Sequence, residues 1–153
     1  MWLSPEFQIY LVKEFQRLKS DEEDRLNLEW NIQRTLAKVN YRIHTDAIRE
    51  NLIPPKLNKQ RIHFIYASEA DLLNVALFGI TAKEWREQNP EKDGNIRDHA
   101  TIEQLVVLSN MESINAVLIH QNFPAAERLQ QLNSIAITQM KSLLNNPQIK
   151  LLK

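Results

Sequence analysis

Apolar residues recur at helical spacing from the start of the chain. Successive members of the first stripe are four, four and three residues apart, which repeats one face of a helix. The first stripe consists of Phe7, Leu11, Phe15 and Leu18. Ser4 is a suitable N-cap, and Pro5 suits the first helical position because the N–H that it lacks would be unpaired there. The pattern therefore predicts a helix that begins at the N-terminal end and carries an apolar face.

A second stripe follows with spacings of four, three and four residues, which is typical of a heptad seam. It consists of Ile32, Leu36, Val39 and Ile43. Ser20 and Glu23 form a capping box that favours a new helix at this point, but nothing between the stripes forces a break, so one continuous helix is the alternative. Some thirty residues would make a rod of ~45 Å. We expect such a rod, ending near Asn51, to lie along other helices or along a second copy.

The helical pattern stops at Pro54-Pro55, because two successive prolines cannot continue a helix. This segment is the best candidate for a linker. A short β-like run, Ile62 to Tyr66, comes next. A lone strand finds no partner in this chain, so the run is either an extended segment or half of an intermolecular pair.

Helical signals return at Ser68, which resembles an N-cap, and Gly79 is suitably placed to end that helix. Two further capping boxes, Thr81 with Glu84 and Thr101 with Gln104, open the following helices. A last helix starts near Pro124 and ends at Asn145, Asn146 and Pro147. The fold class that we predict is all-α, with at most one extended segment near residues 62–66. It comprises a helical arm at 1–53, a linker at 54–67 and a compact helical domain at 68–147.

Composition narrows the choice of function. The 153 residues carry 19 basic and 19 acidic side chains, so the chain lacks the basic excess typical of compact DNA-binding domains. Two glycines exclude the glycine-rich phosphate-binding motifs. The absence of cysteine excludes disulfides and thiolate metal sites, and it fits a cytoplasmic protein. We expect no signal peptide, because the start carries Glu6 and lacks a basic n-region followed by an apolar h-region. We expect no membrane span, because no apolar run approaches ~20 residues.

Catalytic chemistry is not indicated. The four histidines, His44, His63, His99 and His120, lack the spacing of metal ligands. No nucleophile motif is present, so we predict no catalytic residue, no metal site, no cofactor and no small-molecule substrate.

The polar stretch from Gly94 to Thr101 is the candidate interaction loop. Its candidate contact residues are Asn95, Arg97 and Asp98, together with Arg86 of the preceding helix. A recognition loop is one interpretation, since polar loops on rigid helices often bind partners. A capping and turn structure is the commoner one, and an effector or enzyme pocket around Arg86, Arg97 and Asp98 is a third.

Basic residues are mildly enriched early in the chain. Lys13, Arg17 and Lys19 are candidate nucleic-acid contacts, although a solvated helix face is the more common outcome for such residues. Trp30 and Trp85 lie on helical stripes, so we expect core or interface anchors rather than platforms for base stacking.

The opening residues carry a family resemblance. The segment WLSPEFQIYLVKEFQRLK resembles the closing helix of the KilA-N domain, a DNA-binding module of phages, large DNA viruses and bacteria. The residues that match in place are Trp2, Ser4, Pro5, Glu6, Phe7, Glu14 and Phe15. The segments VNYRIHTDAIRENLIP, EADLLNVALFGITAKEWR and GNIRDHATIEQLVVLSN are similar to the region that follows KilA-N in bacterial, especially Bacteroidetes, proteins. The resemblance covers nearly the whole chain.

The resemblance implies that the main DNA-contacting part of the domain precedes this chain. Phe7, Leu11 and Phe15 would then lie at the edge of an incomplete domain. We expect a non-enzymatic accessory and oligomerisation module of a KilA-N-type regulator, similar to phage antirepressors. It would form a homodimer through both stripes and would reach DNA through the full-length protein. Direct DNA binding by this chain is the first alternative, and an enzyme or effector domain is the second.

Overall fold

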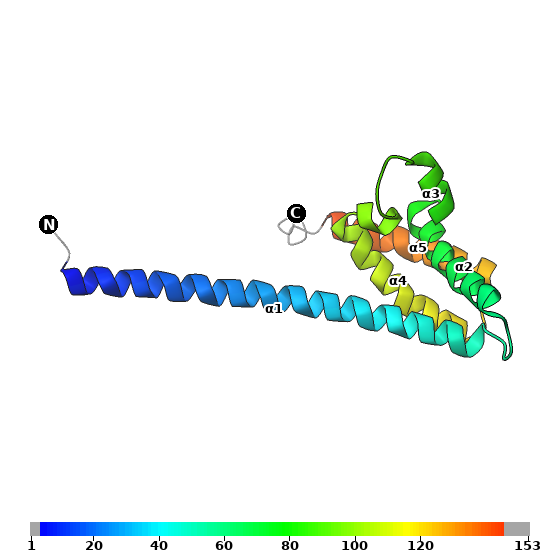
Figure 1. Ribbon diagram of the computed structural model, residues 1–153, viewed down its shortest axis with the longest axis horizontal. Helices are drawn as coiled ribbons and strands as arrows, with labels where there is room; N and C mark the ends of the chain where they lie inside the picture. The colour runs from blue at the N-terminus through cyan, green and yellow to red at the C-terminus, as the bar shows by residue number, and fades with distance from the viewer. Residues whose placement is uncertain (1–3, 146–153) are drawn as a thin grey trace. The chain divides into compact units, whose positions relative to one another are not determined.

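The computed structural model describes residues 4–145, apart from the side chains of residues 29, 30 and 33. The described residues contain helices and no strand, which confirms the all-α fold (Figure 1). The elements are α1 (Pro5–Asn51), α2 (Lys59–Phe78), α3 (Ala82–Gln88), the 3-10 helix η1 (Ile96–His99), α4 (Ile102–His120) and α5 (Ala125–Leu144). Trp2 and the side chain of Trp30, both named from the sequence, lie outside the described residues.

Helix α1 is one continuous helix of 47 residues. At its start the hydroxyl of Ser4 accepts a hydrogen bond from the backbone N–H of Phe7 at 3.2 Å, as an N-cap does. The capping box at Ser20 does not begin a new helix, because no glycine or proline separates the two stripes. The continuous alternative is therefore the correct one, and the helix ends just before Pro54.

The chain divides into two units, and the boundary falls after Lys38, inside α1. The sequence pattern assigned residues 1–53 to the arm, whereas this division counts the last turns of α1 with the second unit. The last turns of α1 belong to the second unit because Ala47 and Ile48 are buried in a cluster with Ala116 and Ile119 of α4. The amide of Asn40 also donates a hydrogen bond to Ser109 Oγ at 3.0 Å.

The prediction of an extended segment at residues 62–66 was wrong, because these residues lie in α2. The helix starts nine residues before the expected Ser68, at Lys59. Its N-cap is Asn58, whose side chain accepts from the backbone N–H of Arg61 at 2.9 Å. Ile65 and Tyr66 pack against the cluster around Ala47, whereas Phe64 is exposed. Tertiary packing of one helical face therefore overrides the β-branched composition of the run.

Three helix termini predicted farther along the chain are confirmed, and the predicted stop at Asn146 and Pro147 lies outside the described residues. Both hydrogen bonds of the capping box are present at Thr81 with Glu84 and at Thr101 with Gln104. Gly79 ends α2 in the left-handed region, with φ at 79°, and its N–H donates to the carbonyl of Val75. Glycine suits this position because a left-handed residue with a Cβ is strained.

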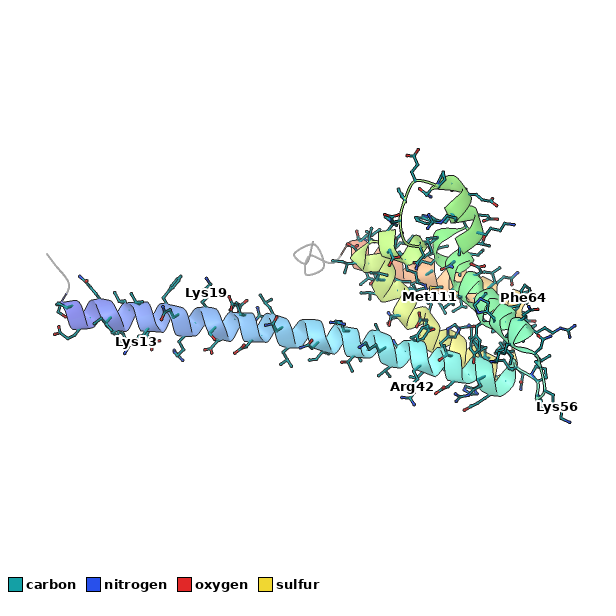
Figure 2. The ribbon with its side chains drawn as sticks, in the orientation of Figure 1. Lys13, Lys19, Arg42, Lys56, Phe64 and Met111 are labelled. Atoms are coloured by element: carbon teal, nitrogen blue, oxygen red, sulfur yellow. The ribbon has the colours of Figure 1, made fainter. Side chains whose placement is uncertain are left out.

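The core of the second unit lies where α2, α4 and α5 pack against one another (Figure 1). Its buried centre includes Leu73 of α2, Met111 of α4 and Leu132 of α5. Figure 2 labels Met111 within this unit and Phe64 on α2, and only the first of these two side chains is buried. The short elements α3 and η1 pack together beside this core and hold the polar loop.

Candidate interaction surfaces

The apolar stripe of α1 is exposed along its length. We call its eight residues the α1 stripe, and each of them is between 42% and 71% exposed. They are Phe7, Leu11, Phe15, Leu18, Ile32, Leu36, Val39 and Ile43. Up to Leu36 these residues lie in the first unit, and Val39 and Ile43 continue the spacing in the second. The structure thus presents every candidate self-association residue at the surface of the chain, in the order the sequence predicts.

The α1 stripe is interrupted by charge in the middle of the helix. Glu22 and Arg25 lie on the same face as the stripe, because they continue its spacing of three and four residues. Arg25 Nη2 lies 2.6 Å from Glu22 Oε1, and both side chains are more than half exposed. The hydrogen bond from Arg25 lowers the pKa of Glu22, so this carboxyl is ionised at neutral pH.

The three basic candidates do not share one face of α1. Each helical residue turns by ~100°, so Lys13 and Arg17 are neighbours on one side, whereas Lys19 is turned well away from both. Figure 2 labels Lys13 and Lys19, and both are exposed. Arg17 Nη2 lies 2.9 Å from Glu14 Oε2, and the hydrogen bond to Glu14 raises the pKa of Arg17. The positive charge of the Lys13–Arg17 face is therefore partly offset by an adjacent carboxylate.

The candidate interaction loop is held by bonds to its own backbone. The guanidinium of Arg86 donates to the carbonyls of Lys92 and Gly94. The side chain of Asn95 accepts from the backbone N–H groups of Arg97 and Asp98, and Asp98 Oδ2 accepts from the N–H of Asn95 at 2.8 Å. These are the contacts of a capping and turn structure. Recognition by the loop remains a prediction.

Arg97 connects the loop to the body of the second unit. Its Nη1 lies 3.2 Å from Glu112 Oε1 on α4, where the Glu112 side chain is 6% exposed. Burial raises the pKa of Glu112, and the positive charge of Arg97 opposes that rise. Arg97 therefore anchors the loop by compensating a buried acid.

Trp85 fixes α3 to the loop, as expected of a core anchor. Its ring is 8% exposed and stacks on His99 of η1, with ring centroids 5.3 Å apart. The guanidinium carbon of Arg86 lies 5.0 Å from the centroid of the Trp85 ring, which is a cation–π contact. His99 Nε2 lies 2.7 Å from the carbonyl oxygen of Asp93. The loop is thus tied to α3 by aromatic stacking as well as by hydrogen bonds.

A buried polar network, which the sequence analysis missed, joins four helices of the second unit. Its centre is Arg128 of α5, which is 3% exposed. Arg128 Nη1 and Nη2 donate to the two carboxylate oxygens of Glu69 on α2, at 2.5 and 2.9 Å. Nη1 also donates to Asn115 Oδ1 on α4 at 3.0 Å, and Nε donates to the carbonyl of Phe123 at 3.0 Å.

His44 brings the end of α1 into this network. Asn115 Nδ2 lies 2.8 Å from His44 Nε2, and the histidine is 4% exposed. Burial lowers the pKa of His44 to about 4; nearby Glu69 opposes the shift and the positive charges of Arg97 and Arg128 add to it. The imidazole is therefore neutral at pH 7, so Nε2 accepts the Asn115 hydrogen bond. The network fixes how four helices meet, and its members are enclosed rather than open to a substrate.

The two hollows described next do not include the polar residues of the candidate interaction loop. One shallow hollow lies on α5, lined by Gln130, Gln131, Ser134 and Ile135, and another lies on α1, lined by Pro5, Gln8, Ile9, Val12, Lys13 and Gln16. Each follows a single helix, and neither includes Arg86, Arg97 or Asp98. Among the residues that the structure describes, no group of three or more His, Cys, Asp or Glu side chains could hold a metal ion.

One described helix, α4, is long and apolar enough by length and composition to cross a membrane. The helix pair α2 and α3, bent by 62°, passes the same test when counted as one span. Half of the apolar window of α4 is buried within the protein, and the helix also holds the buried polar residues Glu112 and Asn115. These features are those of a core helix.

Among the residues on which the resemblance to the KilA-N domain rests, Ser4 and Pro5 lie at the start of α1, and Phe7 and Phe15 lie exposed on it. The resemblance itself stays a prediction. Comparisons with protein-family models, with curated proteins and with solved structures find no match to this chain.

Proposed function

We propose that this chain is a non-enzymatic accessory and self-association module of a KilA-N-type DNA-binding regulator, similar to phage antirepressors and acting in the cytoplasm. The observation that carries the proposal is the exposed α1 stripe. In this function α1 pairs with α1 of a second copy, and DNA is bound through the full-length protein. The closing-helix resemblance supplies the link to DNA, and the stripe supplies the means of association.

The physical argument concerns the cost of exposed apolar surface. Soluble monomers rarely present contiguous apolar patches beyond a few hundred Å². Eight large apolar side chains, each at least 42% exposed, follow one face of α1. Covering the exposed part of each would gain about 1 kcal/mol, so two copies would gain on the order of 15 kcal/mol. This gain equals or exceeds the ~4–15 kcal/mol cost of association, so the stripe can supply the free energy that pairing requires.

The experiment is a mass measurement by light scattering on a sizing column. The wild-type protein should elute as a dimer, and Ile32→Asp with Val39→Asp should elute as a monomer with unchanged helical content. The matched control is Ile9→Asp with Tyr41→Asp, which removes two apolar side chains that are at least as exposed but lie off the stripe. The control should remain a dimer. A wild-type monomer at all accessible concentrations, or equal dissociation of both variants, would contradict the proposal.

Direct DNA binding by this chain is the second candidate, and the exposure of Lys13 and Lys19 favours it. A gel shift at low and raised salt separates the two functions. Retention of DNA that weakens steeply with salt, and that Lys13→Ala with Lys19→Ala reduces, would support direct binding. Absence of retention at low salt would restrict the chain to association.

A further inference from the structure

The polar interruption of the α1 stripe bears on the direction in which two copies would pair. Counting heptads from Leu11 at position d gives one unbroken register through Ile43, with no skipped residue. The d positions are Leu11, Leu18, Arg25, Ile32 and Val39, and the a positions are Phe15, Glu22, Glu29, Leu36 and Ile43. The seam is thus apolar toward both ends and charged for three successive positions in the middle.

A parallel pair would place like charges together. In that arrangement each a residue meets the same a residue of the partner, and each d residue meets the same d residue. Glu22 would face Glu22 of the partner, and Arg25 would face Arg25 of the partner. Glu22 is ionised, as its lowered pKa indicates, and an arginine is always charged. Like charges at the centre of a seam oppose association.

An antiparallel pair removes this conflict. In it each a residue meets a d residue of the partner. The register that matches the apolar ends sets Leu11 level with Ile43 of the partner and Leu18 level with Leu36 of the partner. The same register sets Arg25 level with position 29 of the partner, which the sequence fills with glutamate. Two of the central layers then join opposite charges, and in the layers beside them Glu22 lies level with Ile32 of the partner.

Two further leucines fit this register and lack a role in a parallel seam. Leu26 and Leu28 lie at positions e and g, beside the stripe, and are 49% and 60% exposed. In an antiparallel pair e residues flank e residues and g residues flank g residues. With Leu18 level with Leu36, the two-fold axis falls near residue 27, so each leucine would meet its own copy. In a parallel pair Leu26 would instead lie near Asp21, and Leu28 near residue 33, a glutamine.

We propose that α1 pairs with α1 of a second copy of this chain in antiparallel orientation, with Leu18 level with Leu36 of the partner and Arg25 level with Glu29 of the partner. The inference rests on the proposed self-association and specifies its geometry. It places the second units of the two copies at opposite ends of the paired helices.

Cysteine cross-linking tests the orientation directly, because the chain contains no cysteine of its own. Leu18→Cys and Leu36→Cys proteins, one with a mass tag, are mixed and mildly oxidised. The mixture should give the mixed covalent dimer, and each protein alone should give little. Efficient cross-linking of each protein with itself would refute the orientation. Faster cross-linking of Leu36→Cys with Leu11→Cys would refute the register, because those positions meet after a shift of one heptad.

Exchanging the charges at positions 25 and 29 provides a second test, which needs no cross-linking. Arg25→Glu should raise the dimer dissociation constant ~10-fold or more, because it sets glutamate against glutamate twice. Adding Glu29→Arg should restore most of the affinity. Failure of Glu29→Arg to restore affinity would contradict the Arg25–Glu29 layer, and the cross-links decide the orientation. A monomeric wild-type protein would refute the self-association itself, whereas a stable dimer with self-cross-linking cysteines would refute only the orientation.

Discussion

Replacing Arg128 with methionine should destabilise the second unit strongly. The guanidinium makes four hydrogen bonds, two of them to Glu69 and one each to Asn115 and the Phe123 carbonyl. Methionine retains much of the length of the side chain but none of these donors. The main consequence is that the carboxylate of Glu69, whose side chain is 9% exposed, loses the cation that compensates it.

The size of the loss follows from this burial. Breaking a buried ion pair by removing one partner costs ~3–5 kcal/mol, since the remaining charge stays desolvated. A domain of this size has ~5–15 kcal/mol of total stability, so the variant should lose a large fraction of it. The melting temperature should fall by roughly 10–20 °C. The double variant Glu69→Leu with Arg128→Met should be more stable than Arg128→Met alone, because it leaves no unpaired charge.

Urea denaturation followed by far-UV circular dichroism measures the free energy of unfolding of each variant. The control is Arg49→Met, which removes an exposed ion pair with Asp46 in which the Arg49 side chain is 63% exposed. That variant should lose less than ~1 kcal/mol. If Arg128→Met and Arg49→Met lose the same stability, or if the double variant is the least stable of all, the network does not hold the helices together as argued.

Two further predictions concern the second unit. The pKa of His44 is lowered from 6.5 to about 4, so as the pH falls the unfolded chain binds a proton at His44 before the folded chain does. The contribution of His44 to the free energy of unfolding should therefore be complete above pH 6.5 and fall by about 3 kcal/mol toward pH 4. Urea titrations at pH 6.5 and pH 4 should show a smaller loss of unfolding free energy in His44→Gln than in the control His63→Gln. Equal losses would contradict the role of His44. The raised pKa of Glu112 favours the folded state as the pH falls, and it does so equally in both variants. Gly79→Ala should lose ~1 kcal/mol and Gly79→Asn less, because the left-handed φ of 79° is strained for alanine while a Cβ there meets no atom within 4 Å. Thermal melts compare the two variants, and equal stability of Gly79→Ala and the wild type would refute the backbone argument.

Local rules predicted the helices whose ends carry their own signals. Thr81, Gly79 and Thr101 act on backbone groups a few residues away, so sequence alone placed these termini correctly. The structure differs from the expectation where tertiary packing decides. Ile62 to Tyr66 has β-branched and aromatic composition, but Ile65 and Tyr66 are held in a helix by contacts with α1 and α4. The unit boundary likewise depends on which turns of α1 are buried, and spacing along one helix does not show this.

The buried network marks a different limit of sequence reasoning. Glu69 is four residues before Leu73, and Arg128 is four residues before Leu132, so both lie on faces that pack in the core. A polar residue on a core-facing side of a helix indicates a buried polar contact, but the sequence does not show which residue makes that contact with it. Only the tertiary fold brings Arg128 within 2.5 Å of a carboxylate 59 residues away in sequence. The α1 stripe is the reverse case. Its spacing can be read from the sequence, with a charged interruption at Glu22 and Arg25, and the structure shows each of its eight residues at least 42% exposed. This exposure, while other apolar faces are packed, is the reason for the pairing that we propose.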